Sequence, residues 1–400
     1  MLDAFWTNVH SSYPLLDPQV NTSDTLKCDT PLLGAMFSLA KQYAPQNIVV
    51  NDWDTWSQFM FQALPVEARH PRLETAEAML LWLQRTPKLH RAPTMPGLWS
   101  EVGSLVGILH TLGLHVDPTG WAIPESQKKR RIRIANGIYM LDKWLALGLG
   151  RPSYISRWNV PLPQEADFVD APAAIDHTGD HAFGKYIFIA MAKLSVILAD
   201  VLETFYTMRA VELLKHDSAS RLLHRLGLFE ASLSAFHEEH LGPLLQHPHN
   251  DFGVLDARGT VSLAYFTSQI VLYRAILRHL RSADDMIGVI RERARSVLLN
   301  TTQFLSGLTV SQTQAFWWSP ISRINFAVIG SFMFSMLLTS TDEGQVEFWV
   351  GQIGRYRRLL ELHSASFDTA RLAAKRLELL ACVATGYGEE SGEDPWDLRI

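Results

Sequence analysis

Residues 112–163 decide the fold of this chain, and they begin L-G-L-H-V-D-P-T-G-W-A-I-P. A basic run, K-K-R-R-I-R at 128–133, and an apolar segment, I-Y-M-L-D-K-W-L-A-L-G-L-G-R-P at 138–152, follow. This order predicts a helix that ends at Gly113, a turn with Pro and Trp, and a long helix over about 124–150. Because apolar residues recur at spacings of three and four, the C-terminal half of the long helix is expected to be buried on most sides.

Helical periodicity continues on both sides of this stretch, whereas alternating strand patterns with hairpin turns are nearly absent. Thr30 before Pro31 is typical of an N-cap followed by proline at the first helical position. We therefore predict an all-α fold, a large array of stacked antiparallel helices (α-hairpins) without a substantial sheet. Further helices are expected over about 72–84, 98–112, 183–215, 217–240, 258–281, 284–306, 320–339, 343–363 and 365–385.

The organisation of the chain is predicted from one acidic segment. Residues 164–182 contain five acidic residues and no lysine or arginine, which is typical of a loop. This loop is expected to separate an N-terminal helical half, 1–163, from a C-terminal helical half, 183–385. The acidic, Gly-rich tail, 386–400, is expected to be flexible.

Composition excludes several classes of protein. The 400 residues carry a formal net charge of -5, so the chain is not expected to bind nucleic acid directly. Two cysteines, Cys28 and Cys382, can form neither a disulfide framework nor a cysteine-ligated zinc cluster. Segments 186–202 and 324–339 are interrupted by charge or too short for a membrane span and are expected to be buried helices, so we predict no membrane association.

The basic run at 128–133 has two interpretations. It could be a nuclear import signal or a DNA contact. A solvated charged face on the first turns of a long helix is the interpretation that we favour, because such runs are common on amphipathic helices.

Asp142, Lys143 and Trp144 interrupt an otherwise apolar stretch. Because adjacent residues point about 100° apart on a helix, Asp142 and Lys143 are expected not to pair with each other. Asp142 is instead expected to reach Arg151 around the helix end, or basic side chains one turn back. We favour a buried ion pair that holds the turn after the helix; the alternative is an effector pocket of Asp142, Trp144, Arg151 and Trp158.

Other polar clusters do not form a recognised catalytic motif. His237–His240 lacks the spacing of a zinc-protease helix, and the clusters at 176–181 and 247–251 lie in predicted loops. Asp284 and Asp285 are expected to cap the following helix rather than to bind Mg²⁺. We therefore predict neither a metal site nor catalysis.

Several short motifs follow one another along the chain: F-W-T-N-V-H at 5–10, Y-P-L-L-D at 13–17, G-L-H-V-D-P-T-G-W at 113–121, D-K at 142–143 and G-R-P at 150–152. Their order resembles the fungal-specific transcription factor domain, or middle homology region, of binuclear zinc-cluster regulators. The residues that carry the family signature are His115, Asp117, Pro118, Trp121, Arg130, Arg131, Asp142, Lys143, Trp144, Gly150, Arg151 and Pro152.

Two details qualify the resemblance. Asn136-Gly137 stand roughly where the family has an aromatic pair, and W-W-S-P at 317–320 is similar to a subgroup of nitrogen-utilisation co-activators. The resemblance implies a nuclear regulatory domain of a zinc-cluster transcription factor that controls metabolic genes. It implies no cofactor in this chain, with zinc held only by a six-cysteine cluster upstream of Met1.

The partners implied are the transcription machinery or other regulators, together with a small-molecule effector, and a homodimer stays open. The main alternative is an all-α scaffold or co-activator that works only through protein partners. A metal-dependent helical enzyme is the third alternative.

Overall fold

The structure is a computed structural model that describes residues 1–17, 30–44, 53–86, 96–156, 159–168, 183–247, 255–280, 286–365 and 367–385. The described residues contain helices and turns and no β-strand. The prediction of an all-α fold without a substantial sheet is therefore confirmed.

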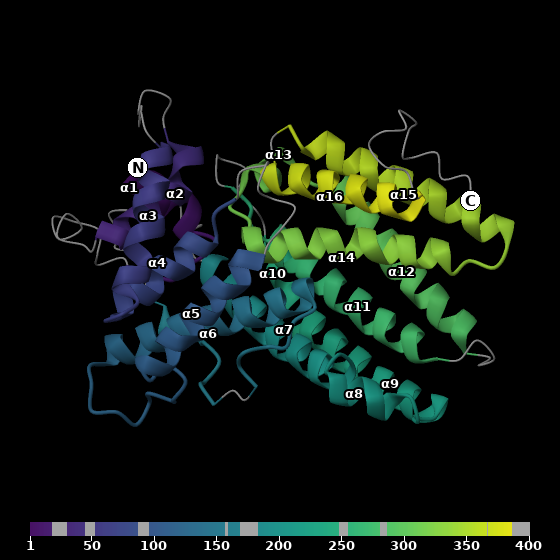
Figure 1. The fold of residues 1–400 in the computed structure, drawn as a ribbon, viewed down its shortest axis with the longest axis horizontal. Helices are drawn as coiled ribbons and strands as arrows, with labels where there is room; N and C mark the ends of the chain where they lie inside the picture. Colours follow the sequence, from purple (N-terminus) through teal and green to yellow (C-terminus); the bar gives the residue numbers. More distant parts are fainter. Residues whose placement is uncertain are drawn as a thin grey trace.

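The N-terminal helices form a group at one end of the molecule (Figure 1). In this group α4 packs against α2, α3, α5 and the long helix α6. The group consists of α1 (Leu2–Ala4) with a π-helical turn (Phe5–His10), α2 (Thr30–Ala40) with a 3₁₀ turn (Lys41–Tyr43), α3 (Trp53–Glu67), α4 (Leu73–Leu83), α5 (Pro96–Thr111) and α6 (Glu125–Leu149).

The remaining helices continue the array toward the other end of the molecule (Figure 1). Here α14 lies in the middle and packs against α6, α11, α15 and α16. After a 3₁₀ turn (Glu165–Asp167), the helices are α7 (Phe183–Phe205), α8 (Met208–Leu214), α9 (Ala219–Phe236) with a π-helical turn (His237–Leu241), α10 (Gly242–Gln246), α11 (Gly259–His279), α12 (Ile287–Ser306), α13 (Val310–Gln314), α14 (Ser319–Leu338), α15 (Glu343–His363) and α16 (Asp368–Thr385).

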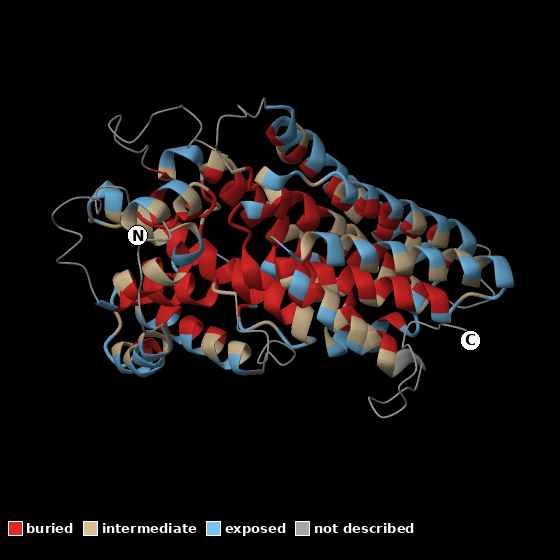
Figure 2. Ribbon diagram, turned by 90° about the horizontal axis from the view of Figure 1, so that it is seen from above, coloured by how far each residue is buried: buried red, intermediate tan, exposed pale blue. Residues whose placement is uncertain are grey.

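Buried residues run through the middle of the array from one group to the other (Figure 2). Residues far apart in sequence meet there, because the Ser12 hydroxyl donates to the Phe316 carbonyl at 2.8 Å and the Trp318 indole donates to the Ser12 carbonyl at 3.3 Å. The Tyr13 ring lies 4.8 Å from that of Trp318. One continuous core therefore joins the start of the chain to the start of α14.

The prediction for the long central helix is confirmed. Helix α6 spans Glu125–Leu149, and every residue from Ile132 to Leu147 is buried. The prediction of a single helix over 183–215 is wrong, because helix α7 ends at Phe205 and a separate helix, α8, begins at Met208. The Thr207 side chain accepts from the Ala210 backbone N–H at 3.1 Å and so caps a new helix at that point.

The helices on either side of the turn end at Gly113 and Gly150, as predicted, and both glycines adopt a left-handed conformation. Gly113 has φ +67° and Gly150 has φ +61°. Two backbone hydrogen bonds close the last turn of each helix. The longer-range bond joins the Leu114 N–H to the Leu109 carbonyl at 2.9 Å in the first helix, and the Arg151 N–H to the Ala146 carbonyl at 3.0 Å in the second. This is the Schellman arrangement, in which glycine adopts positive φ without a Cβ penalty.

Two described helices, α11 and α14, are long and apolar enough to cross a membrane by length and composition alone. In both, 78% of the most apolar window is buried inside the molecule. Burial on this scale is typical of core helices in a helical array.

Candidate functional site

The signature residues of the turn before α6 form a local structure rather than a pocket. The Asp117 carboxylate accepts from the Thr119 N–H at 2.9 Å, and the Trp121 N–H donates to the Pro118 carbonyl at 3.0 Å. Pro118 is buried, whereas His115 and Asp117 are exposed. Trp121 lies against Gly113, where an added Cβ would be 3.4 Å from the indole.

The arginines of the basic run bind neighbouring elements, so the prediction of a solvated face is wrong for them. Arg130 donates to both oxygens of Glu77, at 2.7 and 2.6 Å, and to Glu74 at 2.7 Å. Burial raises the pKa of Glu77, and Arg130 opposes that shift. Arg131 donates to the Leu112 carbonyl at 2.9 Å and lies over the Trp121 ring. The tertiary fold brings carboxylates and carbonyls to this helix face, which the spacing could not reveal.

Arg133 and Asn136 connect α6 to segments far away in sequence. Arg133, 1% exposed, donates to the Leu15 carbonyl at 3.1 Å and also contacts Asp17 and the Asp167 carbonyl. The Asn136 amide nitrogen donates to the Ile132 carbonyl at 2.9 Å and to the Pro161 carbonyl at 3.0 Å.

Gly137 and Asn136 stand where the family has an aromatic pair, and close packing around Gly137 accounts for the small residue. A Cβ at Gly137 would lie 3.1 Å from the Tyr13 hydroxyl oxygen and 3.2 Å from Cδ1 of Leu80. The small residues at 136–137 therefore admit the N-terminal segment and α4 close to α6.

Asp142 and Lys143 pair with each other, which corrects the sequence prediction. Lys143 Nζ lies 3.2 Å from Asp142 Oδ2, and both side chains are buried. Asp142 accepts from the Tyr154 and Ile155 N–H groups at 2.8 and 3.1 Å, and Lys143 contacts the Ile155 carbonyl. The flexible lysine stem bends toward the same turn, which overcomes the 100° between the two Cα–Cβ directions. Burial lowers the pKa of Lys143, and Asp142 opposes that shift.

Of the other residues of the predicted effector pocket, Trp144 and Arg151 lie in the described part of the chain, and neither binds Asp142 there. The Trp144 indole donates to the Ser195 hydroxyl of α7 at 2.9 Å, and Ser195 donates to the Met191 carbonyl at 2.7 Å. Arg151 and Pro152 are exposed after the helix end. Trp158 lies outside the described residues, so the pocket of these four residues stays a prediction.

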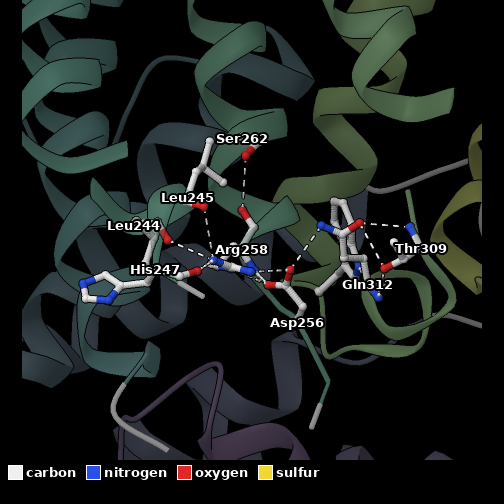
Figure 3. A network of polar contacts seen from close by, with 9 residues as sticks. Leu244, Leu245, His247, Asp256, Arg258, Ser262, Thr309 and Gln312 are labelled. Carbon is white, nitrogen blue, oxygen red and sulfur yellow. Dashed lines mark hydrogen bonds and ion pairs between the residues drawn. The ribbon is translucent and has the colours of Figure 1, made fainter. Parts of the chain in front are cut away.

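A second buried network, around Arg258, was missed by the sequence analysis (Figure 3). The Arg258 guanidinium donates to the carbonyls of Leu244 and His247 at 3.1 and 2.9 Å, at the end of α10. It also binds Asp256 through two nitrogens, at 2.8 and 3.1 Å, and Asp256 accepts from Gln312 at 3.1 Å. The only sequence signal is the D-A-R-G order at 256–259, which suits an Asp side chain that accepts from the backbone two residues later.

The structure describes only some of the histidine and aspartate clusters that the sequence contains. His237–Leu241 form a π-helical turn, and His240 Nε2 lies 2.9 Å from Lys193 Nζ. Within the described ranges, no group of three or more His, Cys, Asp or Glu residues is placed to hold a metal ion. Asp284 and Asp285 lie outside the described residues, and Met286 is the N-cap of α12.

The signature therefore builds a set of anchors along α6 rather than a convergent reaction centre. Paired charges and side-chain hydrogen bonds hold α4, the end of α5, the N-terminal segment, the turn at 153–155 and α7 against one buried rod. Buried groups paired in this way specify one arrangement of neighbouring elements.

The fungal specific transcription factor domain matches residues 2–227, more than half of the chain. The chain belongs to this family.

Three relatives of this chain are fungal transcription regulators. The transcriptional activator protein DAL81 of Saccharomyces cerevisiae is 25% identical over 430 residues, which cover 95% of this chain and 43% of that protein. An uncharacterized transcriptional regulatory protein of Schizosaccharomyces pombe is 25% identical over 393 residues, which cover 94% of this chain and 56% of that protein. Cutinase transcription factor 1 beta of Fusarium vanettenii is 33% identical over 82 residues, 20% of this chain and 9% of that protein.

The chain spans about half the length of the curated relatives that it matches over most of its own length. No solved structure matches it significantly. The chain is thus a domain of the kind that fungal transcription regulators carry.

Proposed function

We propose that this chain is the regulatory domain of a nuclear fungal transcription factor and that it changes the activity of that factor in response to a metabolite or a partner regulator. The family match and the similarity over 95% of the chain to a transcriptional activator support this proposal most strongly. The similarity of the W-W-S-P segment at 317–320 to a subgroup of nitrogen-utilisation co-activators supports nitrogen-utilisation genes as the targets.

The structure suits a domain that relays a signal rather than one that holds DNA. The net charge is -5, and the arginines of the basic run are engaged with Glu74, Glu77 and backbone carbonyls. DNA contacts depend mainly on cationic side chains that can reach phosphates. We therefore assign DNA binding to a zinc cluster outside this chain, and no catalytic activity to the chain itself.

A reporter assay tests the regulatory function. The 400-residue chain is placed between a heterologous DNA-binding domain and a strong activation domain in yeast, and a matched fusion lacks the chain. We expect the chain to make reporter output depend on the nitrogen source by about 5-fold or more, the scale of a coupling of about 1 kcal/mol. The variant Arg209→Ala, at an exposed position of α8, serves as a control and should behave as the wild type.

Two results would contradict the proposal. Equal output of both fusions under every nitrogen source would show that the chain carries no regulation. A stable protein partner captured by the purified chain, with reporter output insensitive to nutrients, would favour the scaffold or co-activator alternative.

A further inference from the structure

Helix α9 presents an exposed face along its whole length. It packs against α7 and α11 and lies at the edge of the array, on the side away from α15 (Figure 1). Leu222, Leu226 and Leu233 turn inward and are buried. On the opposite side, exposed residues recur at spacings of four and three and so form one stripe along the helix. They are Ser220, His224, Gly227, Ala231, Ser234 and Glu238.

The middle of this stripe is small and uncharged. Between Gly227 and Ala235, every exposed residue of α9 lacks a charge. In the described structure, no heavy atom outside the helix lies within 4 Å of a Cβ built on Gly227. Leu228, beside it, is 58% exposed. The outer face of a surface helix typically carries charged and polar residues. Small residues instead let a second helix approach closely, and a helix in that place would cover Leu228.

The two ends of the same face carry opposite charges. The Arg221 side chain is 75% exposed and shares the Asp217 carboxylate with Arg225, at 3.5 and 3.2 Å. Because one carboxylate serves two guanidinium groups, this end of the face is basic. Glu238 and Glu239 are exposed at the other end, and Glu238 has no ion pair within the described ranges. This end is therefore acidic.

This arrangement is complementary to itself when two copies of α9 lie antiparallel. A two-fold axis between residues 229 and 230 brings Arg221 of one copy to the level of Glu238 of the other. The same axis brings Leu228 to the level of Ala231, in the uncharged middle. Each contact then occurs twice, as in an isologous interface. A partner that carries charge of one sign would match only one end of the face.

We propose that this face of α9 binds a second copy of the chain, with the two helices antiparallel. Opposite charges meet at both ends, and the small residues at the centre bring the two helices close enough to cover Leu228 of each copy. One helix per copy makes a smaller interface than the standard size of about 1,600 Å², so the dimer is expected to be weak, with a Kd on the order of 10 µM. Association of this kind does not depend on the proposed function.

A matched pair of variants tests the centre of the face. Analytical ultracentrifugation of the 400-residue chain between about 1 and 100 µM should show a reversible monomer–dimer equilibrium. Ala231→Arg keeps a good helix former but places a cation against Leu228 of the second copy, so the Kd should rise about 10-fold or more. Gly351→Arg adds the same charge at an exposed, open position of α15 and should leave the Kd unchanged.

Two results of this experiment would overturn the proposal. One is a wild-type chain that stays monomeric at every concentration. The other is an equal change of the Kd in Ala231→Arg and Gly351→Arg, because the association would then not use this face of α9.

Charge reversal tests the antiparallel orientation. Arg221→Glu makes both ends of the face acidic, and Glu238→Lys with Glu239→Lys makes both ends basic, so each change should weaken association. A chain with all three substitutions should associate as the wild type does, because opposite charges again meet at both ends. A parallel pair would bring like residues together and could not give this pattern. Failure of the triple variant to recover association would contradict the antiparallel arrangement.

Discussion

Helices α6 and α14 lie against each other in the core, yet some of their buried polar side chains differ in pairing. On α6, Asp142 is paired with Lys143 and with backbone N–H groups. On α14, Ser322 and Asn325 have no partners among the described residues. Burial alone therefore does not reveal what a polar residue does. Pairing separates Asp142 of α6, which we interpret as part of a frame, from Ser322 and Asn325 of α14, which have no such role in the described structure.

The largest effect is expected from breaking the ion pair on α6. Asp142→Ala leaves the buried Lys143 charge and two backbone N–H groups without their acceptor, so we expect a loss of about 3–5 kcal/mol in the free energy of unfolding. Chemical denaturation measures it. Arg151→Ala, at an exposed position after the same helix, is the control and should change stability by less than about 0.5 kcal/mol. A loss below about 1 kcal/mol in Asp142→Ala would mean that the pair does not hold the turn.

Two buried serines allow the same comparison with smaller expected changes in the free energy of unfolding. Ser195 accepts from the Trp144 indole, whereas Ser322 has no partner in the described structure, and both are 0% exposed. Ser195→Ala should cost about 1–3 kcal/mol because it leaves a buried indole N–H unpaired. Ser322→Ala should stay within about 0.5 kcal/mol. Similar losses in the two variants, measured by urea unfolding, would remove the distinction between the two helices.

A side chain at Gly150, after the last turn of α6, should lower stability through the backbone conformation alone. Gly150 has φ +61° and no heavy atom within 4 Å of a Cβ built on it. Gly150→Ala should therefore cost about 1 kcal/mol, from the left-handed conformation rather than from a clash. Urea unfolding can measure this loss, with Gly107→Ala as the helical control. Gly107 also has open space around it and should gain stability as alanine.

The smallest effect concerns pH and the contact between α7 and the π-helical turn. Burial and the neighbouring Lys193 lower the pKa of His240, and Glu239 opposes this. The unfolded state, with a histidine pKa near 6.5, then binds more protons than the folded state. Stability should accordingly be complete above about pH 7 and should decline as the pH falls below about 6.5.

A variant identifies the group responsible for this decline. His240→Gln should flatten the decline only in part, because burial also lowers the pKa of His279. The contribution of His240 should be below about 0.5 kcal/mol, since water reaches the ring and screens the charges. Thermal unfolding between pH 5 and pH 7.5 gives the slope. A steeper decline in the variant than in the wild type would contradict this sign.

Helix positions could be predicted because their signals are local. Thr30 with Pro31, and glycines at 113 and 150, act within a few residues of their own position. The break at Thr207 escaped prediction because the apolar pattern continues across it, and a single capping hydroxyl decides it. The Asp142–Lys143 contact escaped because helix geometry alone neglects the length and bend of a lysine side chain.

The anchoring partners could not be predicted, for a different reason. Arg133 meets Asp17 and the Leu15 carbonyl across more than a hundred residues. Arg258 meets the end of α10, and Ser12 meets Phe316. Such pairs form only after the helices have docked, so no spacing in the sequence records them.

By itself, the sequence determined the helical class, the central buried rod with its glycine ends, and the family, because periodicity, capping and short motifs depend on neighbours along the chain. Only the tertiary structure decided which buried polar groups are paired. Burial makes an unpaired group costly, and whether a partner is present depends on which distant helix lies opposite. For that reason the anchors on α6 and the unpaired face of α14 became visible only in the folded molecule.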